Sequence, residues 1–276
     1  MATKKQVKRT AWDTVQLARN PGRPNVAEYI SMMCEDFVEL HGDRLFGDDR
    51  ALIGGFATIS GVKVMVMGHR KGRTVEENVE SNFGMASPDG YRKAMRLMRI
   101  AEKFGLPVVT FIDTPGAYPG ADAEARGQAE AIAHNLEFMS TLRTPIVVVV
   151  IGEGGSGGAL GIAVGDKILM LQNAVYSVIS PEGCASILWR DGSKAPVAAE
   201  ALKITAESLK KLGVIDEIVP EPAQGAHTDP KATAAAVKKA VLAALKELKR
   251  LSADELVAKR YDKFCAMGRY FEVKGR

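Results

Sequence analysis

A glycine-rich segment in the middle of the chain has the residue types of an anion site built from backbone. The run Val147–Ile151 consists of β-branched residues, as is typical of a buried strand, and it leads directly into Gly152–Gly158. Glycine lets the backbone pass close to a ligand, and the start of a helix adds unpaired N–H groups and positive potential. The segment therefore predicts a site where backbone N–H groups meet a negative charge.

The same glycines also match the dinucleotide-binding fingerprint. Gly152, Gly154 and Gly157 spell G-x-G-x-x-G after a strand. That motif requires an acidic residue about 20 residues later, which binds the ribose. The next expected strand, Lys167–Leu171, is followed by glutamine and asparagine. The sequence therefore disfavours a dinucleotide site.

A second motif overlaps the first. Gly154, Ser156 and Gly158 spell G-x-S-x-G, the nucleophile elbow of serine hydrolases. His227 and His134 are the available bases, but nothing in the sequence marks either as dedicated to Ser156. We favour Ser156 as a small turn residue.

The third interpretation of this segment is an oxyanion hole. An oxyanion hole needs only fixed backbone donors, which is what this segment supplies.

Composition narrows the class of protein. The chain has 276 residues, 46% hydrophobic and 25% charged, with a net charge of +4, which indicates a globular protein and gives no sign of nucleic-acid binding. The three cysteines form no C-x-x-C pair, so the sequence predicts neither a zinc ribbon nor a disulfide framework. The longest apolar run, Ile146–Ile151, is too short for a membrane span. We expect a cytoplasmic protein that binds no metal and no membrane.

Strands alternate with helices along the chain, which predicts an α/β fold with a mainly parallel sheet, βαβ crossovers and C-terminal helices. We expect a helical lead-in over residues 1–50 and a main domain over 51–276, forming one structural unit overall. In chain order the expected elements are an amphipathic segment Val26–Leu40, a hairpin of Leu52–Ile59 and Val62–Gly68, a polar loop Arg70–Pro88, a helix Pro88–Phe104, a strand Val108–Ile112, a helix Asp122–Leu142, strands Ile146–Ile151, Lys167–Leu171, Val175–Ile179 and Gly213–Val219, and helices Pro230–Leu251 and Ala253–Met267.

Two loops follow the strongest strands, Asp113–Gly120 and Gly152–Gly158. The carboxyl ends of parallel strands form the edge where open α/β sheets bind ligands, so the two loops predict a cleft. Turn chemistry explains Asp113–Gly116 equally well, and the sequence does not decide between a cleft rim and a plain turn.

Several strings in the chain resemble one family, the α subunit of bacterial acetyl-CoA carboxylase carboxyltransferase. The similarity extends over roughly residues 10–270. The strings that carry it are Ile112–Gly120, Gly152–Leu160, Tyr176–Trp189, and Asn82–Met85 followed by Tyr91–Ala94.

The resemblance implies a crotonase-like fold and an enzyme, a transferase. The family moves CO₂ from carboxybiotin, held on a separate carrier protein, to acetyl-CoA, giving malonyl-CoA for fatty-acid synthesis. It also implies a partner β subunit with a zinc ribbon and the acetyl-CoA site, a hetero-oligomer of two α and two β subunits, and ATP used only by a separate biotin carboxylase component.

The resemblance implies that the backbone N–H groups of Gly157 and Gly158 stabilise the charge that builds on the ureido oxygen of biotin. A side chain at either position is expected to push the backbone away from the ligand or to force a disallowed φ. Further candidates for the biotin pocket are Gly154, Gly155, Ser156, Pro115, Gly116, Ala117, Tyr118, Phe83, Gly84 and Met85.

Two alternatives remain, a carboxyltransferase subunit for another acyl-CoA and a stand-alone crotonase-type hydratase or isomerase. The hydratase needs a glutamate two residues past the last glycine of the turn, where this chain has Leu160. Glu182, after Pro181, resembles the second catalytic glutamate, but we favour a role for it at a helix start. The acid–base pair for water addition is thus incomplete.

The cations of one expected helix are a further candidate, for an acidic carrier protein or for CoA phosphates. A charge run is more often a solvated helix face, and we favour that interpretation. The residues are Arg92, Lys93, Arg96, Arg99 and Lys103.

We predict that the chain does not bind NAD(H) or NADP(H), because the ribose-binding acid is missing after Leu171. Titration calorimetry with each nucleotide should show no specific heat. Micromolar or tighter binding would restore the dinucleotide interpretation of Gly152–Gly158.

Overall fold

The computed structural model describes residues 9–268, which contain one mixed sheet. The sheet has the order β1-β2-β3-β4-β5-β6-β8, with β7 paired to the end of β5. Pairing is antiparallel from β1 to β3 and parallel from β3 onward. The mainly parallel α/β sheet is thereby confirmed. The strands are β1 (Glu35–Glu39), β2 (Leu52–Ile59), β3 (Val62–His69), β4 (Val108–Thr114), β5 (Ile146–Gly155), β6 (Lys167–Leu171), β7 (Val175–Ser177) and β8 (Glu217–Val219).

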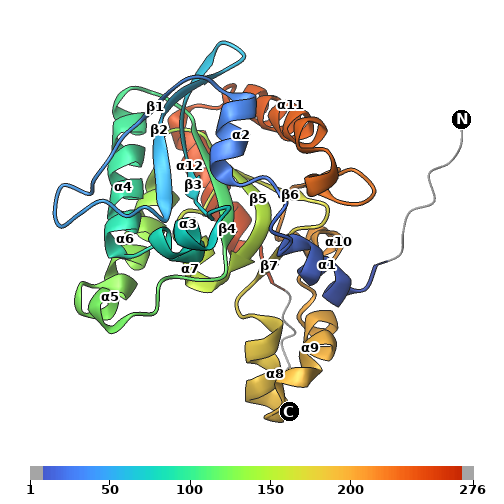
Figure 1. The fold of residues 1–276 in the computed structure, drawn as a ribbon. Coiled ribbons are helices and arrows are strands. Elements are labelled where there is room, and N and C mark those ends of the chain that lie inside the picture. Colours follow the sequence, from blue (N-terminus) through green and yellow to red (C-terminus); the bar gives the residue numbers. More distant parts are fainter. Residues whose placement is uncertain (1–8, 269–276) are drawn as a thin grey trace, which may run out of the picture.

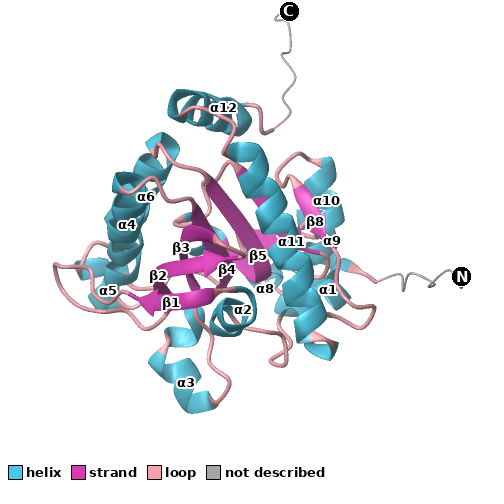
Figure 2. Cartoon of the chain, turned by 90° about the horizontal axis from the view of Figure 1, so that it is seen from above, coloured by secondary structure: helices cyan, strands magenta, loops and turns pink. Residues whose placement is uncertain are grey.

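Helices cover both faces of this sheet, as Figures 1 and 2 show. Helices α2 and α11 lie over one face, and α4 and α6 over the other, whereas α8 and α9 project away from the sheet. No helix within residues 9–268 combines the length and apolarity needed to cross a membrane. The helices are α1 (Ala11–Ala18), α2 (Val26–Met33), α3 (Val75–Glu80), α4 (Pro88–Lys103), α5 (Ala121–Ala125), α6 (Gln128–Thr141), α7 (Ser156–Leu160), α8 (Pro181–Trp189), α9 (Ala195–Leu202), α10 (Ala206–Lys211), α11 (Pro230–Leu248) and α12 (Ala253–Cys265), with single 3₁₀ turns η1 (Asn82–Gly84), η2 (Gly192–Lys194) and η3 (Ala226–Thr228).

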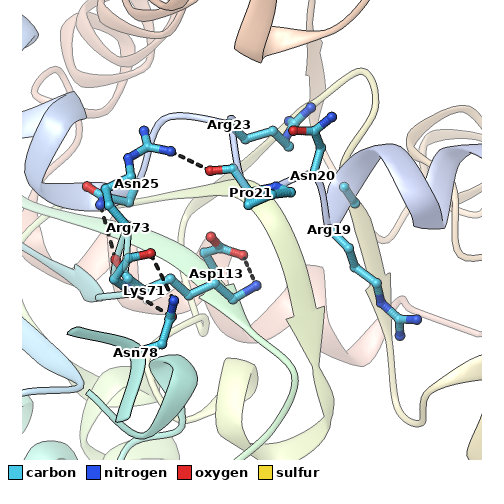
Figure 3. A pocket seen from close by; sticks show the side chains of 11 residues that line it. Arg19, Asn20, Pro21, Arg23, Asn25, Lys71, Arg73, Asn78 and Asp113 are labelled. Atoms are coloured by element: carbon cyan, nitrogen blue, oxygen red, sulfur yellow. Dashed lines mark hydrogen bonds and ion pairs between the residues drawn. The ribbon is translucent and has the colours of Figure 1, made fainter. Parts of the chain in front are cut away.

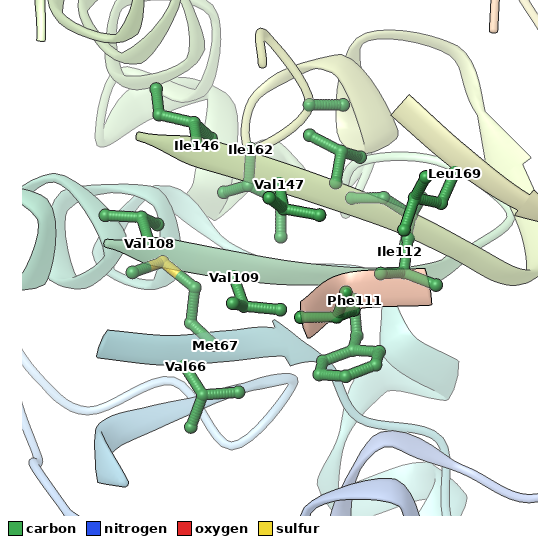
Figure 4. Close-up of a cluster of buried hydrophobic side chains, with 14 of the residues drawn as sticks. Val66, Met67, Val108, Val109, Phe111, Ile112, Ile146, Val147, Ile162 and Leu169 are labelled. Carbon is green, nitrogen blue, oxygen red and sulfur yellow. The ribbon is translucent and has the colours of Figure 1, made fainter. Parts of the chain in front are cut away.

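The central strands β4 and β5 lie in the core shown in Figure 4. Every residue of β4 is buried, and so is the valine run of β5, because helices cover both faces of a parallel sheet. Two strand glycines let the helices approach. A Cβ at Gly54 would lie 2.6 Å from Leu97 of α4, and one at Gly68 would lie 2.8 Å from Val26 of α2.

Two expected elements near the N-terminus differ from the structure. The segment Val26–Leu40 is helical only to Met33. Cys34 is extended, and the chain continues as β1, because pairing with β2 satisfies its backbone. The boundary expected at residue 50 thus falls between two strands of one sheet. The segment expected as a polar loop, Arg70–Pro88, contains α3 and η1. Thr74 caps the start of α3.

Further differences concern breaks that the sequence pattern did not reveal. The helix expected over Asp122–Leu142 is split into α5 and α6 by Gly127, which has a φ of +82°. The strand expected at Val175–Ile179 ends at Ser177. Helices α8, α9 and α10 follow it, and of these the sequence predicted only a helix start near residue 183. The last strand is shortened to β8.

His69, at the end of β3, is fully buried, and neither ring nitrogen has a hydrogen-bond partner among residues 9–268. Burial lowers its pKa to about 4, from an ordinary 6.5. As the pH falls, His69 therefore takes up a proton near pH 6.5 in the unfolded chain but only near pH 4 in the folded chain. Its contribution to stability is full above pH 6.5 and is lost as the pH falls through this window.

We predict that the native chain loses about 2 kcal/mol of unfolding free energy from this group between pH 6.5 and pH 5. A His69→Phe variant should lack that loss, as measured by urea unfolding at each pH. His134→Gln changes an exposed histidine and serves as the control. An unchanged pH dependence in His69→Phe would contradict this assignment.

Candidate active site

The glycine-rich segment is partly strand and partly turn. Strand β5 continues through Gly155, where it pairs with β7, so the first glycines are extended. The turn itself falls at Ser156, which has a φ of +53° and an exposed side chain, and α7 begins there. A non-glycine residue in the left-handed region is strained, and such strain concentrates at functional sites.

The structure brings together the three groups of residues that the sequence proposed for one pocket. A Cβ at Gly158 would collide with the backbone of Gly116 and Ala117, and a Cβ at Gly155 would collide with the carbonyl of Pro115. The turn after β5 therefore packs directly on the loop after β4, main chain against main chain.

The third group, around η1, lies against the same loop. A Cβ at Gly84 would lie 2.9 Å from the carbonyl oxygen of Asp113, and the Tyr118 N–H donates to the Ala86 carbonyl at 3.0 Å. Phe83 has a φ of +55° and is 49% exposed, while Met85, two residues on, is half-buried. The loop after β4 is consequently held between η1 and the turn, so it forms a rim of the site.

Backbone donors remain available at this junction. The first N–H groups of α7, from Ser156 on, have no carbonyl one turn earlier in the helix to bond. In the adjacent loop the Gly116 N–H donates to the Thr114 hydroxyl at 3.2 Å. The Ala117 N–H has no hydrogen-bond partner in the part of the chain that the structure describes. Ala117 and the start of α7 thus offer N–H groups from two touching loops.

An apolar cavity of about 430 Å³ adjoins the turn. This volume is in the range of small-molecule sites. Leu160, in the place where a hydratase would carry glutamate, forms part of the apolar wall. The lining residues are Ser156, Gly157, Leu160, Ile168, Tyr176, Ser177, Val178, Leu202, Leu209, Val214, Phe264 and Met267.

A chain of ion pairs lies at the carboxyl ends of β4 and β5. The Lys71 ammonium is 2.8 Å from Asp113 and 3.4 Å from Glu153, and Arg19 contacts Glu153 at 2.6 Å and Glu182 at 2.5 Å. Burial alone would lower the pKa of Lys71, but the two carboxylates raise it above its ordinary value. The Lys71 ammonium therefore stays charged.

Asp113 also ties the two loops together, because it accepts the Glu153 N–H at 3.0 Å. Lys71, Asp113 and Arg19 line a polar pocket of about 150 Å³ between α1, α2 and the segment before α3, shown in Figure 3. Arg73 closes this pocket by donating to the carbonyl of Pro21. The pocket belongs to the scaffold that fixes the active loops.

Glu182 does not cap its helix. The Ser180 hydroxyl caps α8 by accepting the Gly183 N–H at 3.0 Å, while Glu182 pairs with Arg19. Partial burial would raise the pKa of Glu182, but the hydrogen bond from Arg19 outweighs it and holds the pKa below its ordinary value. Glu182 is engaged by Arg19, and Leu160 offers no second carboxyl group, so the acid–base pair of a hydratase is incomplete.

The cations of α4 anchor a neighbouring loop rather than forming a free patch. Arg92 bonds Asp43 at 2.9 Å, Lys93 bonds Asp48 at 2.5 Å, and Arg96 bonds the carbonyl of Gly42 at 2.9 Å. They hold the connection between β1 and β2. These contacts differ from the solvated helix face that the sequence favoured for these three residues, whereas a role toward a partner stays a prediction.

Other sequence candidates can now be placed. The Ser156 hydroxyl has no hydrogen bond to a histidine within residues 9–268, and His134 pairs with Glu130 instead. This arrangement favours the turn role for Ser156. Residues 9–268 contain no group of three His, Cys, Asp or Glu side chains able to hold a metal.

Sequence reasoning missed several residues of the site. Asp113 and Glu153 lie near the carboxyl ends of two buried strands, β4 and β5, and an acidic residue in that position could have marked them. Arg19 and Lys71 gave no comparable signal, because their partners lie 134 and 42 residues away along the chain.

Comparisons with known proteins agree with this geometry. The structure is similar to transcarboxylase 12S, with a TM-score of 0.69 and 18% identity over 91% of this chain, which is 46% of that protein's length. It is also similar to the Pseudomonas malonate decarboxylase MdcD–MdcE hetero-dimer, with a TM-score of 0.63 and 16% identity over 79% of this chain and 89% of that one. These similarities confirm the crotonase-like α/β fold expected from the sequence.

Sequence comparison identifies the family. Residues 2–268 match the family described as "Acetyl co-enzyme A carboxylase carboxyltransferase-like". The chain is 59% identical over 261 residues to the acetyl-coenzyme A carboxylase carboxyl transferase subunit alpha of Geobacter sulfurreducens, covering 95% of this chain and 82% of that protein. The corresponding subunit of Thermus thermophilus is 57% identical over 263 residues, 95% of this chain and 84% of that protein. The chain belongs to the family of acetyl-CoA carboxylase carboxyltransferase α subunits, and its expected enzyme class is confirmed.

The structure separates the two glycines that the sequence treated alike. A Cβ at Gly157 would meet nothing closer than Ile132 at 3.9 Å, and Gly157 has no positive φ, so a side chain there would not force a disallowed φ. The expected displacement of the backbone from a ligand stays a prediction. At Gly158 the collision is with backbone.

We predict that Gly158→Ala lowers the unfolding free energy by about 1–3 kcal/mol through overpacking. Gly157→Ala should change it by less than about 0.5 kcal/mol. Thermal and urea unfolding of both variants would test the difference. Equal destabilisation would contradict the packing of Gly158 on the loop after β4.

Proposed function

We propose that this chain provides the biotin-facing half of the carboxyltransferase site, at the turn between β5 and α7. The observation that carries the proposal is the contact of two loops whose free N–H groups come from Gly157, Gly158 and Ala117. The cavity beside Gly157 gives the ring of biotin an apolar wall. The proposal is consistent with the family, whose reaction needs a donor site of this kind.

The chemistry follows from the donors. Carboxybiotin supplies the CO₂, and negative charge develops on its ureido oxygen as that group leaves. Fixed N–H groups of Gly157 and Gly158 stabilise this charge without having to reorient, which is the advantage of a backbone oxyanion hole. The Ala117 N–H adds a third donor from the facing loop. The reaction requires no protein nucleophile, which agrees with the turn role of Ser156.

The surrounding residues contribute position. Pro115, Gly116 and Tyr118 shape the rim, and Gly154 and Gly155 leave room for it, since side chains there would strike Tyr176 and Pro115. Phe83, which is exposed, together with Gly84 and Met85 completes the rim on the η1 side.

The partners are also part of the proposal. They are a β subunit with a zinc ribbon and the acetyl-CoA site, and a biotin carboxyl carrier protein, in an assembly of two α and two β subunits. ATP is used by a separate biotin carboxylase component. The role of the family in fatty-acid synthesis supports a cytoplasmic location. This division of labour predicts that the isolated chain is almost inactive.

We predict that malonyl-CoA formation appears only when the chain is mixed with a β subunit and carboxylated carrier. Gly157→Val should then lower kcat by about 10²–10³, because the side chain obstructs the donors at a position where a Cβ meets no protein atom closer than 3.9 Å. Radiometric assay with acetyl-CoA and propionyl-CoA would measure both activity and acyl preference.

Ser156→Ala is the matched control and should keep substantial activity, and the Kd for acetyl-CoA should be unchanged in both variants. Robust carboxyl transfer by the isolated chain would refute the division of labour. Normal kcat with weakened acetyl-CoA binding in Gly157→Val would place the turn in the CoA site instead.

A further inference from the structure

Helix α7 carries the proposed donors, yet it has only five residues. A helix this short is unstable alone and depends on tertiary contacts. Its own hydrogen bonds are few. The Gly161 N–H bonds the Gly157 carbonyl at 2.9 Å, whereas the Ile162 N–H bonds Ala159 at 3.3 Å. Because Ile162 is bonded to Ala159, the Gly158 carbonyl lacks its usual helical donor four residues on.

Tyr91 of α4 supplies that missing donor. Its hydroxyl donates to the Gly158 carbonyl at 3.1 Å, and the side chain is completely buried. Burial raises the pKa of the Tyr91 phenol, so the hydroxyl stays protonated and able to donate. The ring can approach because Gly161 has no side chain, since a Cβ there would lie 2.7 Å from the ring.

Asn135 of α6 holds the other end of the same turn. Its side-chain nitrogen donates to the Gly161 carbonyl at 2.9 Å, and it too is fully buried. Gly161 in turn bonds Gly157. Tyr91 and Asn135 therefore hydrogen-bond carbonyl groups at the C-terminal end of α7. The unpaired N–H groups lie at the opposite end of this helix.

We propose that Tyr91 and Asn135 are positioning residues for the oxyanion donors of α7. Neither touches a reacting atom. A hydrogen bond to a peptide carbonyl polarises the N–H of the same peptide unit, so the Tyr91 bond acts on the Ala159 N–H, the amide that follows the proposed donors. The Tyr91 and Asn135 bonds together fix the orientation of the turn that carries those donors. The proposal rests on the proposed function of this turn. It gives α4 and α6 a role in positioning the donors.

Tyr91→Phe tests the proposal in the reconstituted α–β complex. We expect kcat to fall about tenfold, less than the 10²–10³ for deleting a donor outright, with the KM for acetyl-CoA unchanged. Tyr29→Phe is the matched control. Tyr29 is equally buried, and its hydroxyl has no hydrogen-bond partner within residues 9–268, so kcat should stay at the wild-type value.

A second measurement does not depend on activity. In the amide NMR spectrum of the isolated chain, the Ala159 proton should move upfield in Tyr91→Phe and stay in place in Tyr29→Phe. Asn135→Leu gives an independent variant, with kcat again reduced at constant KM, and it serves if Tyr91→Phe does not fold.

The outcomes are separable. Wild-type kcat in both Tyr91→Phe and Asn135→Leu, in a complex that Gly157→Val inactivates, would overturn the positioning role and leave the proposed function standing. An equal loss in the Tyr29→Phe control would also overturn it, since the effect would then be one of general core stability. An inactive wild-type complex would refute the proposed function itself.

Discussion

The active loops depend on one close contact, the packing of Gly158 against the backbone of Gly116 and Ala117. This contact exists because β4 and β5 are parallel neighbours, so their carboxyl ends reach the same edge of the sheet. A register shift between Ile112 and Thr114 lets β5 continue to pair beyond the regular ladder. The result is that two loops meet with no side chain between them, and the site is assembled from main chain.

The ion pairs below the loops hold this arrangement in place. Asp113 accepts both the Lys71 ammonium and the Glu153 N–H, so one carboxylate joins β4 to β5. Arg19, from the connection that follows α1, joins the same cluster through Glu153 and Glu182. The N-terminal helices are therefore part of the support of the site rather than an appendage. Buried charges of this kind are costly to separate, which favours a rigid edge.

Much of this could be predicted from sequence. The valine run and the glycines of the β5 turn have a local physical signature, and the strings around Gly116 and Gly158 carried the family resemblance. Breaks set by distant partners could not be predicted. The segment Val26–Leu40 changes from helix to strand after Met33 because β2 offers an edge for pairing, and Arg92 and Lys93 of α4 pair with Asp43 and Asp48. The hydrogen bonds from Tyr91 and Asn135 that hold α7 could not be predicted for the same reason, since Tyr91 and Gly158 are 67 residues apart.

The proposed oxyanion donors are peptide N–H groups, and this has a consequence for how such an enzyme behaves. Peptide amides do not ionise over the physiological range, so the oxyanion turn contributes no pH dependence of its own. A bell-shaped rate profile would therefore report groups other than the donors themselves. Replacing side chains one at a time by alanine would report packing at Gly158 and little at Gly157, so it would not reveal the proposed donor role of either residue. Such a site depends on the path of the main chain, and solved structures at only 15–18% identity share the fold that sets this path.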